Sequence, residues 1–325
     1  MGADSVPGKE GRARARSDSP LPRAKGNRKA KQAQELLGGA GTATHTEKRA
    51  ALDVIRREQF WAEAAELTPH LVAEVGALRL VVSTQDEVAG RKLFVSGSRV
   101  EIGALDEAVA QLRRSRRRGA PWQPGDILDV GANIGSTTFP ALAKHFERAV
   151  AVEPHPENCL LLRLNALLNG MEKRLVVVEA AVSGTPGRAP LFLSRRGSGG
   201  HTLLPDETMA HIEWNDPVDV RVETIESLVN EGLVDPDRLG LVWMDAQGSE
   251  PGILQSAAPI LERRVPIVVE VMTRRDLGWL ESLAETYTHV APLRRPREPA
   301  PARLAVGLAE KAGKRGAPAA DLLFF

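Results

Sequence analysis

The stretch Ile127-Leu128-Asp129-Val130-Gly131-Ala132-Asn133-Ile134-Gly135-Ser136-Thr137 predicts a buried strand, a glycine-containing loop and the start of a helix. In a parallel sheet, a nucleotide-like ligand binds at this kind of turn, because glycines let the backbone approach the ligand and the helix offers free amides. The glycines are spaced G-x-x-x-G, whereas a dinucleotide-binding loop has G-x-G-x-x-G, and no Gly-Lys-Ser/Thr follows as in a P-loop. The spacing therefore favours a ligand that has no phosphate for the loop to hold.

A carboxylate follows the next apolar run at a distance typical of ribose binding. The run 149–152 ends in Glu153-Pro154, 24 residues after Asp129. A carboxylate at the tip of the second strand can accept hydrogen bonds from both hydroxyls of a ribose. The alternative is a surface glutamate before a proline turn, and the glycine loop upstream favours the ribose site.

From Pro121 onwards, short apolar runs alternate with helical segments. The predicted strands are 127–130, 149–152, 175–178, 239–244 and 267–271, and the predicted helices are 136–146, 156–168, 225–231 and 250–262. Uninterrupted apolar strands are typical of a parallel sheet that is covered on both faces. The alternation predicts an α/β fold, a Rossmann-like, doubly wound sheet with helices on both faces, over residues 121–325.

Residues 1–44 consist mainly of polar and small residues. Residues 1–31 contain nine Lys or Arg and three Asp or Glu, although the whole chain carries only +1. Such a segment buries too little apolar surface to offset the entropy lost on ordering it, so we expect a disordered basic tail. The tail contains no aromatic residue that could stack on bases, which favours a solubilising extension over a nucleic-acid-binding arm.

Residues 45–120 are predicted to form a small region of helices and strands. Apolar residues at near-helical spacing predict a helix over 46–64 with Thr46 as its cap, and β-branched runs at 78–83 and 92–95 predict a pair of strands. A second helix around 105–112 ends in five arginines, Arg113, Arg114, Arg116, Arg117 and Arg118. Cations at a helix C-terminus interact favourably with the helix dipole, so a solvated helix end is favoured over an RNA-binding patch.

Several classes of protein are excluded by composition. The chain has one cysteine, Cys159, so it can form neither an internal disulfide nor a Cys-rich zinc site. It has no apolar run near the roughly 18 residues that a membrane span needs, and its first residues have no signal-peptide core. These features predict a cytoplasmic protein without a membrane partner; no metal ligand is assigned from them, and they leave open the oligomeric state and whether a metal is needed.

Five segments together carry a family resemblance. They are 129–135 (DVGANIG), 152–158 (VEPHPEN), 165–169 (NALLN), 181–183 (AVS) and 245–250 (DAQGSE). In content and order they resemble the FkbM family of S-adenosylmethionine-dependent methyltransferases. The similarity covers about residues 126–271, a little under half of the chain. The resemblance implies a class I methyltransferase fold, a seven-stranded sheet with an antiparallel last hairpin in which 321–325 is the final edge strand.

The resemblance also implies S-adenosyl-L-methionine as the cofactor and assigns residues to it. Asp129, Gly131 and Gly135 are expected to shape the pocket for the methionine part, and Glu153 to hold the ribose. Two further residues, Asn133 and Ser136, are expected to line the same loop. Ala181, in the segment 179–183 at the end of the third strand, is expected beside the adenine.

Three residues are candidates for the chemistry of methyl transfer. Asp245 follows the fourth strand, where open sheets have their sites, and is the first choice for contact with the acceptor or the methyl donor. Glu250, in the first turn of the next helix, is a candidate helix cap, base or metal ligand. His201, in a Gly-rich basic loop, is a candidate base or an exposed side chain. Members of the family often have a Lys two positions before the Asp, but here Trp243 stands there.

Two kinds of methyl transfer do not fit the sequence, and this limits the class of methyl acceptor. Methylation at cytosine C5 needs a cysteine nucleophile, and Cys159 falls in an apolar helical run. Enzymes that methylate exocyclic amines resemble one another in an Asn/Asp-Pro-Pro-aromatic motif, which the segment 245–248 lacks. The family resemblance implies methyl transfer to an oxygen, and together with these exclusions it predicts O-methylation of a hydroxyl on a small molecule or sugar. The alternatives are a nucleic-acid methyltransferase that uses the basic tail and a non-catalytic Rossmann-like binding module.

Overall fold

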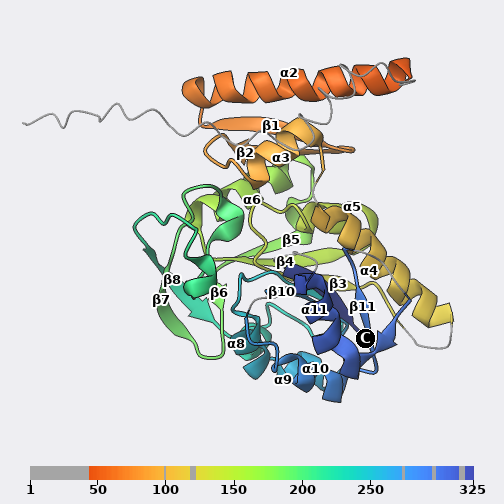
Figure 1. Cartoon of the computed structure of the whole chain (residues 1–325). Helices are drawn as coiled ribbons and strands as arrows, with labels where there is room; N and C mark the ends of the chain where they lie inside the picture. The colour runs from red at the N-terminus through yellow and green to blue at the C-terminus, as the bar shows by residue number, and fades with distance from the viewer. Residues whose placement is uncertain (1–43, 99, 118–121, 273–274, 295–297, 315–318) are drawn as a thin grey trace, which may run out of the picture. The chain divides into compact units, whose positions relative to one another are not determined.

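A mainly parallel sheet occupies the centre of residues 56–325 in the computed structural model, which describes residues 44–98, 100–117, 122–272, 275–294, 298–314 and 319–325. Among these residues, eight strands pair in the order β12-β11-β13-β10-β9-β3-β4-β5 (Figure 1). Their bounds are β3 Asp126–Val130, β4 Arg148–Glu153, β5 Leu175–Glu179, β9 Leu239–Met244, β10 Ile267–Met272, β11 His289–Pro292, β12 Ala300–Pro301 and β13 Ala319–Phe324. All five predicted strands are found, and they pair in parallel.

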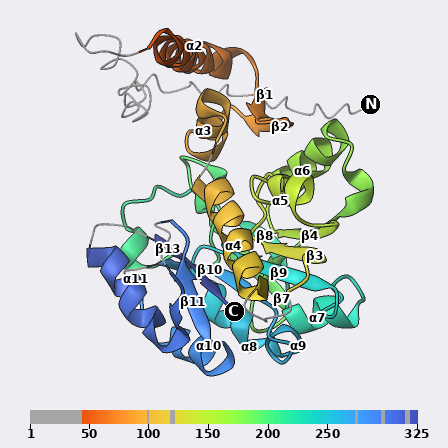
Figure 2. The ribbon, with the colours of Figure 1, turned by 90° about the vertical axis from the view of Figure 1, so that its right-hand side faces the viewer.

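Alternate residues of each strand enter two separate cores, because successive side chains of a strand point to opposite faces. Ile127 and Trp243 pack on one face, whereas Leu128 and Met244 pack on the other. The first face is covered by α4 (Val100–Arg117), α5 (Thr138–Lys144) and α6 (Pro156–Leu168). The second is covered by α7 (Ile225–Asn230), α8 (Glu250–Gln255), α9 (Ala258–Leu261), α10 (Leu280–Thr286) and α11 (Ala305–Lys314) (Figure 2). The predicted α/β fold with helices on both faces is confirmed.

The final strand does not lie at the edge of the sheet, and that prediction is wrong. β13 runs antiparallel between β10 and β11, and the short β12 lies at the edge. Leu322, Leu323 and Phe324 are each 0% exposed. Such a continuous apolar run would be unfavourable at an open edge, and between two strands both of its faces are covered.

The predicted helix over 250–262 is divided into α8 and α9. Pro259 stands in the first turn of α9, where its missing amide costs no helical hydrogen bond. The hydroxyl of Ser256, just after α8, donates to the carbonyl oxygens of Ile253 and Ser183. These contacts end the first helix and start the second.

The region before the sheet contains an antiparallel hairpin, formed by β1 (His70–Val75) and β2 (Leu78–Ser83) with Gly76 at a φ of 62°. Residues 92–95, predicted to pair with 78–83, instead lie in helix α3 (Ala89–Ser96). The Asp86 Oδ1 atom accepts hydrogen bonds from the amides of Val88 and Ala89 at 3.0 and 2.8 Å, which initiates a helix there. The true partner, 70–75, alternates between apolar and polar residues less regularly and was missed.

Helix α2 (His45–Leu67) begins one residue before the predicted Thr46 cap. The cap is Thr44, whose hydroxyl accepts from the Glu47 amide at 3.3 Å while Glu47 accepts from the Thr44 amide at 2.8 Å. Clustering of contacts separates residues 1–55 from residues 56–325. The predicted basic tail lies outside the described residues apart from Thr44, as does Arg118, and the division at residues 44 and 120 stays a prediction.

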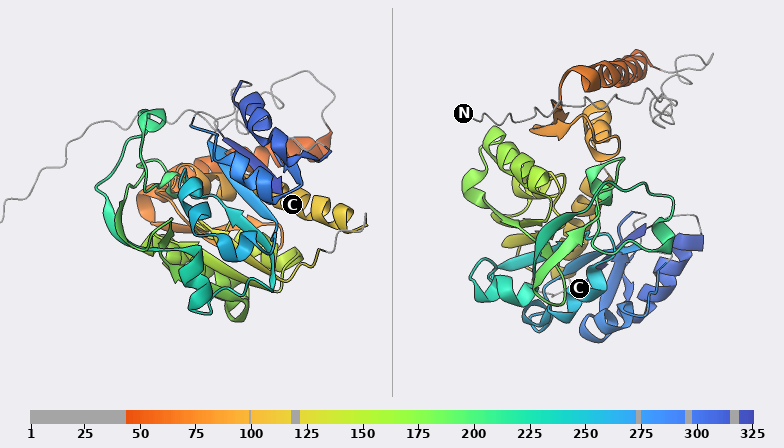
Figure 3. Two further views of the ribbon diagram at one scale, coloured as in Figure 1. Left: turned by 90° about the horizontal axis from the view of Figure 1, so that it is seen from below. Right: turned by 90° about the vertical axis from the view of Figure 1, so that its left-hand side faces the viewer.

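A smaller three-stranded sheet, β6-β8-β7, was not predicted. It consists of β6 (Ala181–Val182), β7 (Gly187–Leu191) and β8 (Val218–Glu223) and is drawn in green in Figure 3. Its first strand directly follows β5, so that it carries the chain from the edge of the central sheet towards the loop 194–203. No helix among the described residues is long and apolar enough to cross a membrane.

Two asparagines, one on α6 and one directly after its last residue, bind the free edge of the hairpin. The Asn165 side chain accepts from the Val81 amide at 2.6 Å and donates to the carbonyl oxygens of Val81 and Ile134 at 3.3 and 3.0 Å. Asn169, one turn later, accepts from the Arg79 amide at 3.0 Å and donates to the Arg79 carbonyl oxygen at 2.7 Å. The pair therefore takes the place of a neighbouring strand, and Asn165 also fixes the glycine loop.

Replacing these two asparagines is expected to have unequal effects on stability. Asn165 is 0% exposed, so Asn165→Leu leaves buried backbone groups unpaired and is expected to cost about 3 kcal/mol of unfolding free energy. Asn169→Leu, the matched control at the more exposed end, is expected to cost about 1 kcal/mol. Urea unfolding measures both. Equal costs would contradict the role assigned to the Ile134 contact.

Candidate functional site

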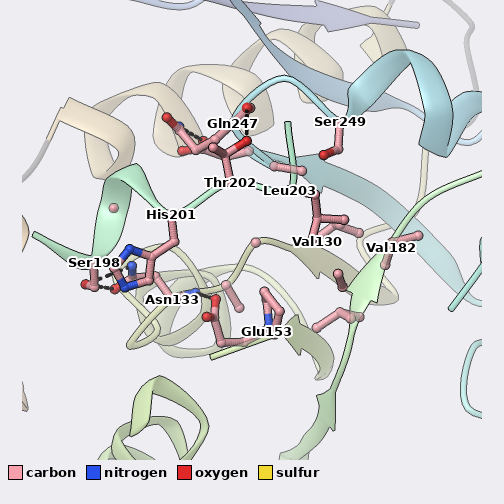
Figure 4. Close-up of a pocket in the computed structure, with 18 of the residues that line it drawn as sticks. Val130, Asn133, Glu153, Val182, Ser198, His201, Thr202, Leu203, Gln247 and Ser249 are labelled. Carbon is pink, nitrogen blue, oxygen red and sulfur yellow. Dashed lines mark hydrogen bonds between the residues drawn. The ribbon is translucent and has the colours of Figure 1, made fainter. Parts of the chain in front are cut away.

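A pocket opens at the carboxyl ends of β3, β4 and β9 (Figure 4). This is the edge at which open α/β sheets bind their ligands. The loop 194–203 and strand β6 complete the wall. The side chains that line it include Val130, Asn133, Ser136, Val152, Glu153, Ala181, Val182, Leu191, Ser198, His201, Thr202, Leu203, Asp245, Gln247 and Ser249. Apolar and hydrogen-bonding surfaces alternate around the pocket.

The glycine loop after β3 needs an unusual backbone. Gly131 has a φ of 83°, and a Cβ there would overlap the carbonyl oxygen of Asp245. Asn133 also has a positive φ, 53°, which asparagine adopts more easily than other side chains do. Its own side chain accepts from the next amide, that of Ile134, at 2.8 Å. The loop can therefore approach the end of β9 closely and turn its amides towards the end of β4.

Glu153 is the buried carboxylate that this loop surrounds. It is 4% exposed, and among the described residues three groups donate to it. The amide of Asn133 binds Oε2 at 2.8 Å, while the amide of His155 and the side chain of Asn158 bind Oε1 at 2.9 and 3.1 Å. Burial raises the pKa of Glu153, and these three donors oppose the rise. A carboxylate has about four lone-pair positions, so Oε2 keeps one for a ligand hydroxyl.

The predicted cofactor residues fall into two groups. Gly131, Asn133, Ser136, Glu153 and Ala181 line the pocket. The other two, Asp129 and Gly135, are not among the residues that line it.

Asp129 lies beneath the glycine loop. It is 1% exposed, and Oδ2 accepts from the Thr138 hydroxyl at 2.5 Å, which ties β3 to the first turn of α5. Burial raises the pKa of Asp129 to about 7, and the negative charges of Asp245 and Glu153 add to the shift. Asp129 therefore holds the glycine loop in place through Thr138 without lining the pocket.

Asp245 is placed at the pocket by the end of β9. Its Oδ1 accepts from the Gln247 side chain at 2.7 Å. The same Gln247 nitrogen donates to Oε2 of Glu270, on β10, also at 2.7 Å. Sequence reasoning found Asp245 but missed Gln247, whose positive φ of 50° no local pattern signals, and gave Glu270 no role.

Glu250 binds the loop that precedes it and is not among the pocket-lining residues. It is 1% exposed, and its two oxygens accept from the amides of Ala246 and Gly248 at 2.8 and 2.9 Å. Burial raises the pKa of Glu250 to about 7. The N-cap of α8 is Ser249, and the contacts of Glu250 hold the loop before this helix, so the roles of helix cap, base and metal ligand stay predictions.

His201 lines the pocket beside Asn133 and Ser198 (Figure 4). Its Nδ1 accepts from the Ser194 amide at 3.1 Å, so the neutral ring carries its proton on Nε2. Burial lowers the pKa of His201 to about 4, and the nearby His155, whose ring centroid is 5.0 Å away, adds to the shift. Near neutral pH, His201 is therefore a hydrogen-bond donor more readily than a base.

Hydrogen bonds hold the loop that carries His201 at two points. Asn133 donates to the Ser198 hydroxyl at 3.0 Å, and that hydroxyl donates to Oδ2 of Asp86 at 2.7 Å. Near the end of the loop, the Thr202 hydroxyl donates to the Gln247 carbonyl oxygen at 3.0 Å. Asp86 and Thr202 carry no sequence signal for this role, because their partners are remote in the sequence. Among the described residues, no group of three or more His, Cys, Asp or Glu side chains could hold a metal ion.

Just over half of the chain matches the model of one known protein family. The family model described as the methyltransferase FkbM domain matches residues 129–295. No curated protein sequence matches the chain significantly.

Solved structures similar to the chain include three methyltransferases. A tRNA methyltransferase from M. jannaschii is 13% identical with a TM-score of 0.37, over 79% of this chain and 54% of that one. An S-adenosylmethionine-dependent methyltransferase from Agrobacterium tumefaciens is 10% identical with a TM-score of 0.40, over 80% and 70%. The C-terminal domain of precorrin-6Y C5,15-methyltransferase from Rhodobacter capsulatus is 14% identical with a TM-score of 0.33, over 57% and 71%. The chain thus spans about half the length of the M. jannaschii enzyme.

The buried carboxyls make a prediction about stability and pH. Asp129 and Glu250 have pKa values of about 7 in the folded protein, above their usual values of 3.8 and 4.5. Between these limits the folded state binds more protons than the unfolded state, so stability falls as pH rises from about 4 to about 8. Scanning calorimetry is expected to show a melting temperature that decreases from pH 5.5 to pH 8.

The variant Asp129→Asn isolates one part of this effect. Asparagine is neutral at every pH and keeps an oxygen for the Thr138 hydroxyl. The loss of unfolding free energy between pH 5.5 and pH 8 is therefore expected to be smaller in this variant by on the order of 1–3 kcal/mol. An unchanged pH dependence in this variant would show that Asp129 is ionised throughout the range.

Proposed function

The chain belongs to the FkbM methyltransferase family, and we propose that it transfers the methyl group of S-adenosyl-L-methionine to a hydroxyl of a small molecule or sugar. The observation that carries the proposal is the pocket at the carboxyl ends of β3, β4 and β9, with Glu153 at its base. A methyltransferase needs a site for a nucleoside and a site for an acceptor, and both fit along this edge.

The residues of the pocket fit this cofactor by the chemistry of their side chains. Glu153 keeps one acceptor position for a ribose hydroxyl, and Ser136 and Asn133 offer polar groups on the glycine loop. Val152, Ala181 and Val182 provide apolar surface that suits an aromatic base. The three donors already on Glu153 leave room for one strong ribose contact rather than the two expected from the sequence.

The chemistry makes one demand on the acceptor side. When bound, S-adenosyl-L-methionine would supply a methyl group carried on a sulfonium. The acceptor oxygen would form the new C–O bond as the C–S bond breaks, and the electron pair of the C–S bond would stay on sulfur. The protein has to align the acceptor and take the hydroxyl proton. We assign proton acceptance to Asp245, which lines the pocket and whose carboxylate is held by Gln247. We assign His201 the role of a donor to the bound ligands, in keeping with its Nε2 proton.

Two alternatives remain outcomes of the tests. A nucleic-acid methyltransferase would draw on residues 1–44, which apart from Thr44 lie outside the described residues, and no observation on the described part of the chain favours it. A binding module without activity would bind the cofactor and methylate nothing.

The direct experiment combines binding with product detection. Calorimetry with the purified chain is expected to show S-adenosyl-L-methionine binding at one site. Incubation of metabolite and glycan extracts with methyl-labelled S-adenosyl-L-methionine, followed by mass spectrometry, is expected to reveal a labelled methyl ether. Label in RNA would support the first alternative, and cofactor binding without label in any extract would support the second.

Replacing Glu153 is expected to weaken cofactor binding. Glu153→Ala removes the ribose acceptor and leaves three protein donors unpaired, so affinity is expected to fall by about 2 kcal/mol, or roughly 30-fold. Glu223→Ala, a buried carboxylate on β8 that does not line the pocket, is the control and is expected to leave affinity unchanged. Calorimetry measures both, and unchanged affinity in Glu153→Ala would remove Glu153 from the site.

Replacing Asp245 is expected to act on turnover. Asp245→Asn keeps an oxygen for Gln247 but cannot accept the acceptor proton near neutral pH, so turnover is expected to fall about 100-fold or more. Cofactor affinity is expected to change only a few fold. Turnover is followed as label incorporated into the product found above, and normal turnover would exclude Asp245 as the base.

A further inference from the structure

A buried charge network lies directly behind Asp245. Glu270 on β10 is 8% exposed and Asp321 on β13 is 3% exposed. Arg294, just after β11, joins the two: its Nη2 donates to Oε1 of Glu270 and its Nε donates to Oδ2 of Asp321, both at 2.7 Å. The register of the sheet places them together, because Glu270 pairs directly with Asp321.

Gln247 links this network to the pocket. Its side-chain nitrogen donates one hydrogen bond to Asp245 and one to Glu270, each at 2.7 Å. One amide group thus holds two carboxyls that come from neighbouring strands. The strained φ of 50° at Gln247 shows that the surrounding structure fixes this residue in place.

The charges of the network do not balance if all its acids are ionised. Asp245, Glu270 and Asp321 would carry three negative charges against the one positive charge of Arg294. Glu101, on α4, adds its charge from the side of the first helix layer. Two carboxyls bridged by one amide, of which Glu270 is buried, repel each other when both are ionised, and this repulsion favours retention of one proton by the pair.

We propose that Glu270 is a positioning residue for methyl transfer: it holds the proton that the Asp245–Glu270 pair retains, and thereby keeps Asp245 ionised at the pocket wall. Arg294 is balanced by Asp321, so Glu270 needs no negative charge of its own. Gln247 fixes the distance between the two carboxyls. The inference rests on the proposed function, since Asp245 is the residue that takes the acceptor proton.

The electrostatics of the two residues support this division. Burial raises the pKa of Glu270 well above its usual value, and the negative charge of Asp245 and a hydrogen bond with its carboxylate raise it further. Burial raises the pKa of Asp321 only to about 6, because the Arg294 guanidinium opposes the shift. These directions support assignment of the retained proton to Glu270 rather than to Asp321.

The first test detects the proton without any ligand. Infrared spectra at pH 7 are recorded for the full chain and for Glu270→Gln, which is neutral at every pH. The difference spectrum is expected to contain the C=O band of a protonated carboxyl, which is lost in the variant and shifts in heavy water. Glu223→Gln is the matched control: Glu223 is also 8% exposed but pairs with Arg221 at 3.0 Å, and it is expected to keep the band. Absence of a difference band would overturn the proposal.

The second test uses the charge of the ligand as a probe. S-adenosylmethionine is a cation at sulfur and S-adenosylhomocysteine is neutral there, so the ratio of their affinities reports the charge near the methyl site. When Glu270 loses its proton as the pH is raised, the preference for the cation is expected to rise roughly three- to tenfold. Glu270→Gln is expected to show a flat ratio that equals the wild-type ratio at pH 7, and Glu223→Gln to behave like the wild type.

The outcomes separate this inference from the proposed function. If neither ligand binds, the proposed function fails, and the infrared band still decides whether Glu270 holds a proton. If both bind but Glu270→Gln lowers the ratio about tenfold at pH 7, Glu270 is ionised and the inference is wrong. Melting curves show whether Glu270→Gln is folded, and the wild-type ratio and infrared pH titration decide the question if it is not.

Discussion

The site depends on one buried carboxylate, Glu153, and on the amide that it binds. The hydrogen bond from the Asn133 amide joins the loop after β3 to the end of β4, and the other two donors join that end to the start of α6. Because the carboxylate is 4% exposed, losing any of these donors would leave a buried charge poorly solvated. The same contact that organises the loop therefore leaves one position for a ligand. The base of the pocket is thus formed by the Glu153 carboxylate together with the donors that make its burial possible.

How far the sequence predicts this structure depends on how local the signal is. The strand, glycine loop and Glu153 are close in the chain, and their spacing identified them. The segment 92–95 was expected to be a strand but lies in helix α3. The reason is a side chain outside the segment: Asp86 accepts hydrogen bonds from the amides at the start of that helix. The position of the last strand, β13, depends on which strands flank it, and its own composition does not specify that.

The acidic network behind the pocket shows the same limit in the site. Gln247, Glu270, Arg294 and Asp321 come from β9, β10, β11 and β13 or the loops after them, and the sheet register brings them together. Sequence reasoning identified Asp245 because it follows a strand in a recognisable motif. It also singled out His201 and Glu250, and in the folded protein Nδ1 of His201 and both carboxylate oxygens of Glu250 accept hydrogen bonds from backbone amides. Chemistry-bearing residues are thus easier to find in a sequence than the partners that decide their roles.

We propose that this pocket binds S-adenosyl-L-methionine through Glu153 and presents Asp245 to an acceptor. The decisive measurement is a crystal structure of the chain with S-adenosylhomocysteine. We expect S-adenosylhomocysteine to lie along the ends of β3, β4 and β9, with a ribose hydroxyl on Oε2 of Glu153, the base against Ala181 and the sulfur facing Asp245. A ligand bound elsewhere, or a ribose without contact to Glu153, would contradict it.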